Sequence, residues 1–312
     1  MPYFISHKSA LEFWRSPQAS EYLTSDRLRN RKLPTRAEEL GSLPDISRWG
    51  LSEPLHVLVN DIGARPKSHM LYRHNCSVQL PKNSFIEVSP ELLVSTPELC
   101  FVQMADEFDD IELIKLGIEL CGTYRLYGED MANQSFDSAT PLTSVARLSS
   151  YVTRASGLKG RLRSEVAMRY IVDNSASPME TVMFVRFTLP YRLGGYSLPK
   201  PILNHPIYLP GRDMPLYRAD QCWPEAKLIV EYNSKEYHAI EPEQIARDEI
   251  RRNALTALGY QVIIVTYDHL KSTVLLNKTV EEISKILGKR QQYPKGFAQR
   301  QAKLRRQLMP WL

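Results

Sequence analysis

The sequence predicts an α+β protein of two domains, and three observations lead to this fold class. Its 312 residues suffice for two separate hydrophobic cores. Short strand-like segments followed by helical periodicity fill the first half, whereas the second half alternates helix, three strands, helix and strand. Finally, 43% hydrophobic and 24% charged residues are the proportions of a globular chain rather than a disordered one.

The first half predicts a smaller α+β domain over residues 1–150. HVLVN (56–60) alternates in hydrophobicity as a strand does, and two further strands are expected within hairpin distance, SVQLP (77–81) and SFIEVS (84–89). Thr96-Pro97-Glu98 predicts the start of a helix, because threonine can cap, proline fits the first helical position and glutamate favours the positive end of the dipole.

A second helix in this half is expected to end at Gly122. The serine-rich stretch 125–150 is typical of a linker or loop. A basic helix at about 158–172 follows it, and the domain boundary is placed near this helix.

The second half predicts a domain over residues 151–288. Its expected elements are a helix at 177–189, strands at 203–209, 215–222 and 227–233, a helix at 243–258, a strand at 260–267 and a helix at 269–287. In the helix expected at 243–258, Ile250 and Leu255 should face inward and Arg251 outward. YQVIIVTY (260–267) is apolar throughout, which predicts a strand buried on both faces.

Charge is distributed unevenly along the chain, although the net charge is only +5. Cations collect in three runs, at 27–36, 154–169 and 289–306, and acids collect at 106–112. Such segregation suits a protein that meets a polyanion, and solvated helix faces explain each run equally well. Residues 289–312 are expected to form a basic tail, and the candidate nucleic-acid contacts are Arg247, Arg251, Arg252, Lys159, Arg161 and Arg163.

The sequence predicts a cytoplasmic protein that does not engage a membrane. No apolar run approaches the length of a membrane span, and the first thirty residues lack the core of a signal peptide. The four cysteines are widely scattered without a CxxC pair, which indicates buried free thiols in a reducing compartment. His69, His74 and Cys76 are metal-compatible residue types but lack a fourth ligand at a usual spacing, so a loop is the simpler interpretation.

The stretch AKLIVEYNSKEYH (226–238) carries the chemistry that we expect. If residues 223–226 form a hairpin loop, Cys222 pairs with Lys227 and Asp220 lies opposite Ile229. Asp220 and Glu231 then share a face as diagonal neighbours, roughly 7–8 Å apart. Two carboxylates in one pocket repel each other unless a cation lies between them, and hard oxygen ligands suit Mg²⁺ or Mn²⁺.

Further candidates surround this pair. His238 is a candidate base for the attacking water, and Glu180 a third acid; Asn233 and Lys235 are additional candidate catalytic residues. Each has a structural alternative. Asp220 and Glu231 could be edge-strand charges, Glu180 the second half of a Ser177-x-x-Glu180 capping box, Asn233 a turn residue, and Lys235 and His238 solvated surface residues.

These residues belong to a longer pattern that resembles a known family. RADQCWPEAKLIVEYNSKEYH followed by ARDEIRRNALTALGYQVIIVTYDHL is similar to the very-short-patch-repair-like endonuclease domains, a branch of the PD-(D/E)XK restriction-endonuclease-like superfamily. The shared features are an acid before Trp-Pro, E-Y-x-x-x-x-Y-H and D-x-x-R-x-x-x-L-x-x-x-G, and the SPMET stretch matches a helix that supplies an extra acid. The resemblance covers about residues 175–270 and implies an αβββαβ core.

By this resemblance, Asp220 and Glu231 would bind the metal, Glu180 would lie near them, and His238 would serve as base. Asp248 and Arg251 would organise the site. The position two after the glutamate is commonly aspartate in this branch and lysine in other members, whereas here it is Asn233, which offers less charge. The first half weakly resembles antitoxin-like regulators linked to abortive infection, through LHVLV and VSTPELCFVQMA.

The sequence therefore predicts a Mg²⁺-dependent DNA endonuclease that hydrolyses phosphodiester bonds, in DNA repair or phage defence. Its expected partners are DNA, a second copy of the chain and a regulatory protein. The alternative is a non-catalytic DNA-binding regulator or antitoxin-like protein with a degenerate nuclease core, as Asn233 and the regulator-like first half would suit. A protein-interaction module that uses the basic tail is a third hypothesis.

Overall fold

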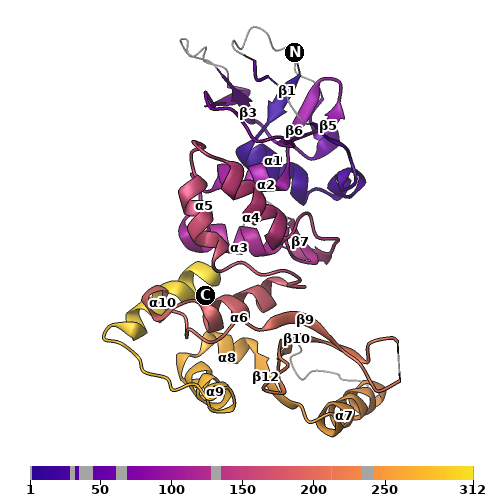
Figure 1. The fold of residues 1–312 in the computed structure, drawn as a ribbon, viewed down its shortest axis with the longest axis vertical. Helices are drawn as coiled ribbons and strands as arrows, with labels where there is room; N and C mark the ends of the chain where they lie inside the picture. The colour runs from indigo at the N-terminus through magenta and orange to yellow at the C-terminus, as the bar shows by residue number, and fades with distance from the viewer. Residues whose placement is uncertain are drawn as a thin grey trace. The chain divides into compact units, whose positions relative to one another are not determined.

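The structure, a computed structural model, describes residues 2–28, 32–34, 45–60, 69–127, 135–211, 213–233 and 242–311, with the backbone alone for 242–248. It is a mixed α and β protein, which confirms the predicted α+β class (Figure 1). The chain divides into two compact units, residues 1–173 and 174–312. The N-terminal unit is therefore the longer one, and it extends beyond the expected boundary at residue 150 to include the basic helical region.

Unit 1 is built on a mixed sheet of six strands in the order β2-β5-β6-β1-β3-β4. Parallel pairing joins β1 to β6 and β3 to β4, and the remaining neighbours are antiparallel. The strands are β1 (Tyr3–Ile5), β2 (Arg27–Leu28), β3 (Leu55–Val59), β4 (Leu71–Asn75), β5 (Phe85–Ser89) and β6 (Leu92–Ser95), and a separate hairpin joins β7 (Tyr124–Tyr127) to β8 (Ser135–Ser138).

Two of the three strands predicted here are present, at β3 and β5. The strand predicted at 77–81 was wrong, because the chain pairs with β3 through residues 71–75 instead. LYRHN of β4 is half-exposed or exposed at every position, as befits the last strand of a sheet. A polar edge strand of this kind has no hydrophobic alternation by which the sequence could reveal it.

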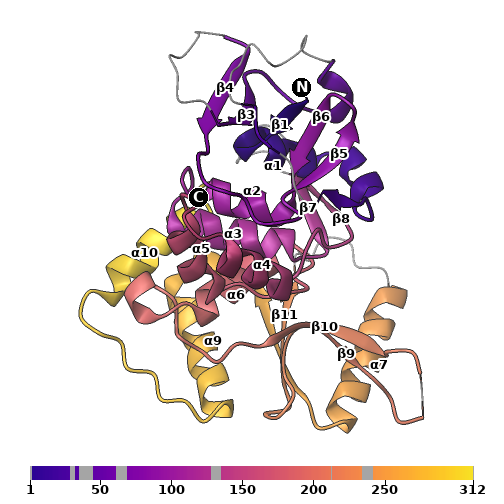
Figure 2. The same cartoon turned by 45° about the horizontal axis from the view of Figure 1, so that its top comes forward.

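The helices of unit 1 include α1, which packs against the sheet, and a bundle of four others (Figures 1 and 2). Asp109 caps α3 through a complete capping box with Glu112. The Asp109 side chain accepts the backbone N–H of Glu112, and the Glu112 side chain accepts the backbone N–H of Asp109. The helices are α1 (His7–Arg15), α2 (Pro97–Met104), α3 (Asp110–Leu120), α4 (Val145–Arg154) and α5 (Arg161–Met168), with short 3₁₀ turns at Pro17–Tyr22 and Ser47–Trp49.

The chain between α4 and α5 shows why the basic helical region belongs to unit 1. Gly160 begins α5 with φ of +85°, and a Cβ there would collide with the backbone oxygen of Val102 in α2. Ser144 caps α4 through its side chain, so part of the stretch predicted as a linker is helical. Leu148, Tyr151 and Val152 of α4 are buried, which ties this helix to the core of the unit.

Unit 2 follows the predicted order of helix, three strands, helix and strand. Its sheet has the order β12-β11-β10-β9, antiparallel except for the parallel pair β11 and β12. The elements are α6 (Pro178–Thr188), a 3₁₀ turn η4 (Tyr191–Leu193), β9 (Ile202–Ile207), β10 (Tyr217–Trp223), β11 (Leu228–Asn233), α7 (Pro242–Ala257), β12 (Gln261–Thr266), α8 (Tyr267–Lys271), α9 (Thr273–Ile286) and α10 (Phe297–Leu308).

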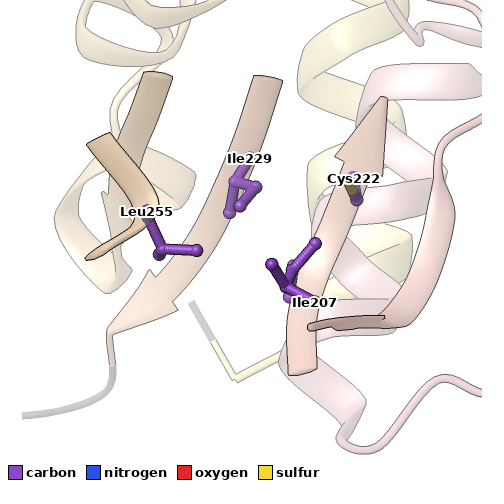
Figure 3. Packing of buried hydrophobic residues seen from close by; sticks show 5 residues of the cluster. Ile207, Cys222, Ile229 and Leu255 are labelled. Atoms are coloured by element: carbon purple, nitrogen blue, oxygen red, sulfur yellow. The ribbon is translucent and has the colours of Figure 1, made fainter. Parts of the chain in front are cut away.

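A small apolar core joins α7 to the sheet. Leu255 of α7 packs against Ile229 of β11, Cys222 of β10 and Ile207 of β9 (Figure 3). Each of these side chains is at most 4% exposed. This core fixes α7 over the face of the hairpin on which the candidate site lies.

Three further expectations for unit 2 need correction. Strand β12 lies at the edge of the sheet, so Ile264 is 36% exposed and the strand is not buried on both faces. Ile250, expected inward, is 68% exposed. The helix predicted at 269–287 is interrupted at Ser272, which ends α8 and caps α9.

The basic tail is folded in the structure. Residues 297–308 form α10, which packs on α6 and on η4. Tyr293 and Phe297 stack on each other and contact Tyr191 and Tyr196, so these two aromatic side chains dock the tail to unit 2. Within the part of the chain that the structure describes, no helix combines the length and apolarity needed to cross a membrane.

Candidate active site

The hairpin of β10 and β11 brings two carboxylates face to face. Its register pairs Cys222 with Ile229, and the same register continued toward the open end sets Asp220 opposite Glu231. The predicted register, with Cys222 opposite Lys227, was wrong by two residues because the turn occupies 224–227. Both acids nevertheless lie on one face of the sheet, as predicted. Asp220 and Glu231 are direct neighbours across the two strands and not diagonal ones.

Backbone and side-chain donors hold the two carboxylates at the point where the β ladder opens. The N–H of Tyr232 donates to Oδ2 of Asp220 at 2.7 Å, and the N–H of Asp220 donates to Oε1 of Glu231 at 3.4 Å. The hydroxyl of Tyr217 donates to Oε2 of Glu231. Glu231 is 8% exposed, so this carboxylate is both buried and oriented.

Glu180 is a third acid, supplied by the first turn of α6. Ser177 caps the helix by accepting the N–H of Glu180 at 3.1 Å, which is one half of the expected capping box. The Glu180 carboxylate accepts instead from the N–H of Ala176 at 3.0 Å and from the side-chain amide of Asn204 at 2.8 Å. Glu180 is thus bound to the start of its own helix and to β9, and it is 8% exposed.

The electrostatics show that the three acids share one environment. Burial is the main cause that raises the pKa of Asp220, and the charges of Glu231 and Glu180 raise it further. Burial likewise raises the pKa of Glu231, against the hydrogen bond from Tyr217, and raises the pKa of Glu180. A site of this kind favours either a retained proton or a bound cation.

The donor set fits a hard divalent cation. Carboxylate oxygens from two adjacent strands are the ligands that Mg²⁺ and Mn²⁺ take in proteins, and a cation would offset the burial of both charges. The ligand atoms of Asp220, Glu231 and Glu180 do not all lie within 4.8 Å of one another, so the three acids do not form a closed cage. Among the described residues, a group that meets this distance lies in unit 1 instead. Mg²⁺ is usually bound by one or two protein carboxylates, and water molecules complete its coordination shell.

Two residues beside the acids have roles that the sequence did not show. Arg251 was expected to point outward, yet its guanidinium lies 4.4 Å from the ring centroid of Tyr217, and its charge lowers the pKa of both Asp220 and Glu231. Tyr217 was not singled out at all. No spacing marks it, because its contact with Glu231 depends on the register of two strands and not on a motif.

The structure describes only some of the other predicted site residues. Asn233 ends β11, is half-buried and pairs with Thr266 of β12. Arg252 of α7 is exposed. Lys235 and His238 lie outside the described residues, as do the side chains of Arg247 and Asp248.

The three candidate nucleic-acid contacts in unit 1 are engaged within that unit. Lys159, 87% exposed, forms an ion pair with Asp106. Arg161 donates to the backbone oxygen of Val152 at 3.2 Å. Arg163 donates to the backbone oxygens of Ala105 and Phe108 and to Asp110, and so closes the end of α2. Acidic and basic runs that are segregated in the sequence therefore meet in space.

Comparisons with known proteins add little to this geometry. No protein-family profile matches the chain, and no solved structure matches it. The chain is similar to two uncharacterized proteins of Mycobacterium tuberculosis, one from strain CDC 1551 and one from strain H37Rv. Each is 36% identical over 76 residues, which is 24% of this chain and 27% of the relative, so the similarity spans about a quarter of those proteins.

Proposed function

We propose that the chain is a metal-dependent DNA endonuclease whose active site lies in unit 2. The observation that carries the proposal is the pair of carboxylates Asp220 and Glu231, directly opposite each other on β10 and β11, with Glu180 of α6 in the same electrostatic environment. The order of elements around them is the α-β-β-β-α-β order of the nuclease family that the sequence resembles.

In this proposal Asp220 and Glu231 would hold Mg²⁺ or Mn²⁺. The bound ion supplies a water of lowered pKa and neutralises negative charge on the phosphate. The Tyr217 hydroxyl keeps Glu231 oriented and favours its ionised form. Arg251 offers a positive charge next to the two acids, where a phosphate of the substrate would also lie.

Glu180 and His238 complete the proposed set of residues. Glu180 is held by Ala176 and Asn204, which makes it suited to hold a proton or a water near the pair rather than to move. His238 is the proposed base, from its place in the sequence pattern E-Y-x-x-x-x-Y-H. Exposed cations of the tail, such as Arg290, Lys295, Lys303 and Arg306, are candidates for contacts with the DNA backbone.

The setting of this proposal is the cytoplasm. All four cysteines are free and buried, which suits a reducing compartment.

The proposal is tested by incubating the purified full chain with supercoiled plasmid and Mg²⁺ or Mn²⁺. Nicking should require the metal and should be lost in Asp220→Asn and in Glu231→Gln, which preserve shape and remove charge. Asp213→Asn, an exposed acid of the same unit, is the matched control and should nick as the unaltered protein does. Nicking that survives both site substitutions would end the assignment.

One observation favours a second candidate function. Asn233 provides an amide where nucleases of this type commonly have a charged residue, so a non-catalytic DNA-binding regulator remains the alternative. Salt-sensitive binding of duplex DNA without cleavage in either metal would favour it, because phosphate contacts weaken as salt rises.

A further inference from the structure

Unit 1 contains a cluster of three histidines and a glutamate that the proposed nuclease function does not use. His7 begins α1, His56 lies on β3, His74 on β4, and Glu107 follows the end of α2. Ligand atoms of His7, His74 and Glu107 all lie within 4.8 Å of one another. Nδ1 of His56 lies 2.9 Å from Nε2 of His74 and 4.0 Å from Oε1 of Glu107.

We propose that His7, His74 and Glu107 form a binding site for a zinc-type divalent cation, with His56 beside them as a candidate fourth ligand. Imidazole nitrogens with one carboxylate are a ligand set that Zn²⁺ takes in tetrahedral sites. With metal–nitrogen bonds of about 2.0–2.1 Å, neighbouring ligand atoms in a tetrahedron lie roughly 3.3 Å apart. The separations of 2.9 and 4.0 Å at His56 bracket this value. The rings of His7 and His74 are stacked with an interplanar angle of 9°, so they must tilt apart before the lone pairs of both can reach one ion.

The surroundings of His7 support a built site. His7 has a φ of +48°, in the left-handed region that non-glycine residues rarely adopt. Two residues of α2 fix it there: Gln103 accepts its N–H at 3.1 Å, and the thiol of Cys100 donates to its carbonyl oxygen at 3.8 Å. Residues held in such a conformation are concentrated at functional sites, where the surrounding structure maintains them.

The protonation states also suit a metal. Burial lowers the pKa of His7 to about 2 and that of His74 to about 4, and it lowers the pKa of His56 as well. All three rings are therefore neutral near pH 7, the form that coordinates a cation without first releasing a proton. The hydroxyl of Ser6 lies 3.1 Å from Nδ1 of His7 and orients that ring; with the proton on Nδ1, donated to Ser6, Nε2 is the atom that would bind the metal.

The alternative is that the cluster only packs. The rings of His7 and His74 are stacked with centroids 3.4 Å apart, and Tyr72 lies against His56 and His74. A stack of neutral imidazoles would be a sufficient structural role without a metal. Coordination differs from packing in one measurable respect: it depends on Glu107, whose side chain is 33% exposed and contributes no stacking.

A metal here would join three separate segments of unit 1. Strands β3 and β4 are the parallel pair at one edge of the sheet, and α1 and α2 pack against each other beside them. A cation bound by His74, His7 and Glu107 would tie that edge to both helices. The partly exposed Glu107 gives the cation a path from solvent.

The test uses the full chain with Asp220→Asn and Glu231→Gln, so that the candidate site of unit 2 does not contribute. After treatment with chelator, the protein is titrated with Co²⁺ and followed by its visible ligand-field absorption, and bound Co²⁺ is then displaced with Zn²⁺. We expect one equivalent of Co²⁺ with the intense spectrum of four-coordination. His74→Gln and Glu107→Gln should weaken binding by more than about 100-fold.

His69→Gln is the matched control, since His69 is exposed and is not part of the cluster, and it should bind as the parent does. Circular dichroism establishes whether each variant is folded. If His74→Gln does not fold, Glu107→Gln still decides the test. Absence of a four-coordinate spectrum in the parent, or an unchanged spectrum in folded Glu107→Gln, would overturn the proposal. Neither result depends on whether the chain cleaves DNA.

Discussion

Replacing Asp220 with asparagine should make the metal-free protein more stable at alkaline pH. Asp220 and Glu231 both have a folded-state pKa above the unfolded values of about 3.9 and 4.3, so the folded chain binds more protons than the unfolded chain between those values and the raised ones. The free energy of unfolding therefore falls as pH rises through this window. Asp220→Asn removes one of the two facing charges and still offers an oxygen to the N–H of Tyr232.

The size of the effect follows from the pKa shift. The pKa of Asp220 is raised to about 8, and each pKa unit corresponds to 1.36 kcal/mol, so counting only half of this rise gives a difference of about 3 kcal/mol. We expect Asp220→Asn to raise the free energy of unfolding by about this amount at pH 8.5 and by little at pH 4, where Asp220 is protonated in the folded chain and about half protonated in the unfolded chain. Its benefit should shrink when Mg²⁺ is present, because a bound cation stabilises the native pair of charges.

The assay is urea-induced unfolding in chelator at both pH values, followed by tryptophan fluorescence, to which Trp223 on β10 contributes. Asp213→Asn, which removes an exposed acid of the same unit, corrects for the change in net charge. A variant that is no more stable than the parent at pH 8.5, or equally stabilised at both pH values, would refute the reasoning that burial and mutual repulsion govern this pair.

Three further predictions concern individual contacts. Tyr217→Phe removes the hydrogen bond to Glu231, worth about 1.5–3 kcal/mol to a charged acceptor, so the pH profile of metal-dependent nicking should move upward by one to two units; an unmoved profile would mean that the hydroxyl does not act on Glu231. Gly160→Ala should destabilise unit 1 by more than about 2 kcal/mol in thermal unfolding, whereas Gly157→Ala, also at positive φ but with room for a Cβ, should cost only about 1 kcal/mol; equal losses would contradict the predicted collision with α2. Glu98→Gln should cost about 3 kcal/mol in urea unfolding, because the 1% exposed carboxylate bonds Arg27 and Thr143; a loss below 1 kcal/mol would show that its partners are re-solvated at little cost.

The sequence predicted unit 2 well because its signals are local. The N-cap at Ser177, the apolar strand before Glu231 and the glycine after α7 each depend on a few adjacent residues, and the order of elements followed from them. The pairing of Asp220 with Glu231 on one face followed from alternation alone, which is why it survived an error of two residues in the register.

What the sequence did not show depends on contacts between distant residues. Glu98 was expected to favour the dipole of its own helix, and it does lie in the first turn of α2, but it is buried against Arg27, 71 residues away. His74 was considered with its sequence neighbours His69 and Cys76, whereas it contacts His7 and His56. Periodicity carries no information about such pairs, because they are fixed by the topology of the sheet.

The division of the chain at residues 173 and 174 has a consequence for genetics. Every described member of the candidate active site, from Glu180 to Arg251, belongs to the second unit, and the histidine cluster belongs to the first. A mutation in the histidine cluster and a mutation in the carboxylate pair should therefore give different phenotypes. A phenotype caused by the first mutation alone would reveal a function of unit 1 that does not depend on the carboxylates of unit 2.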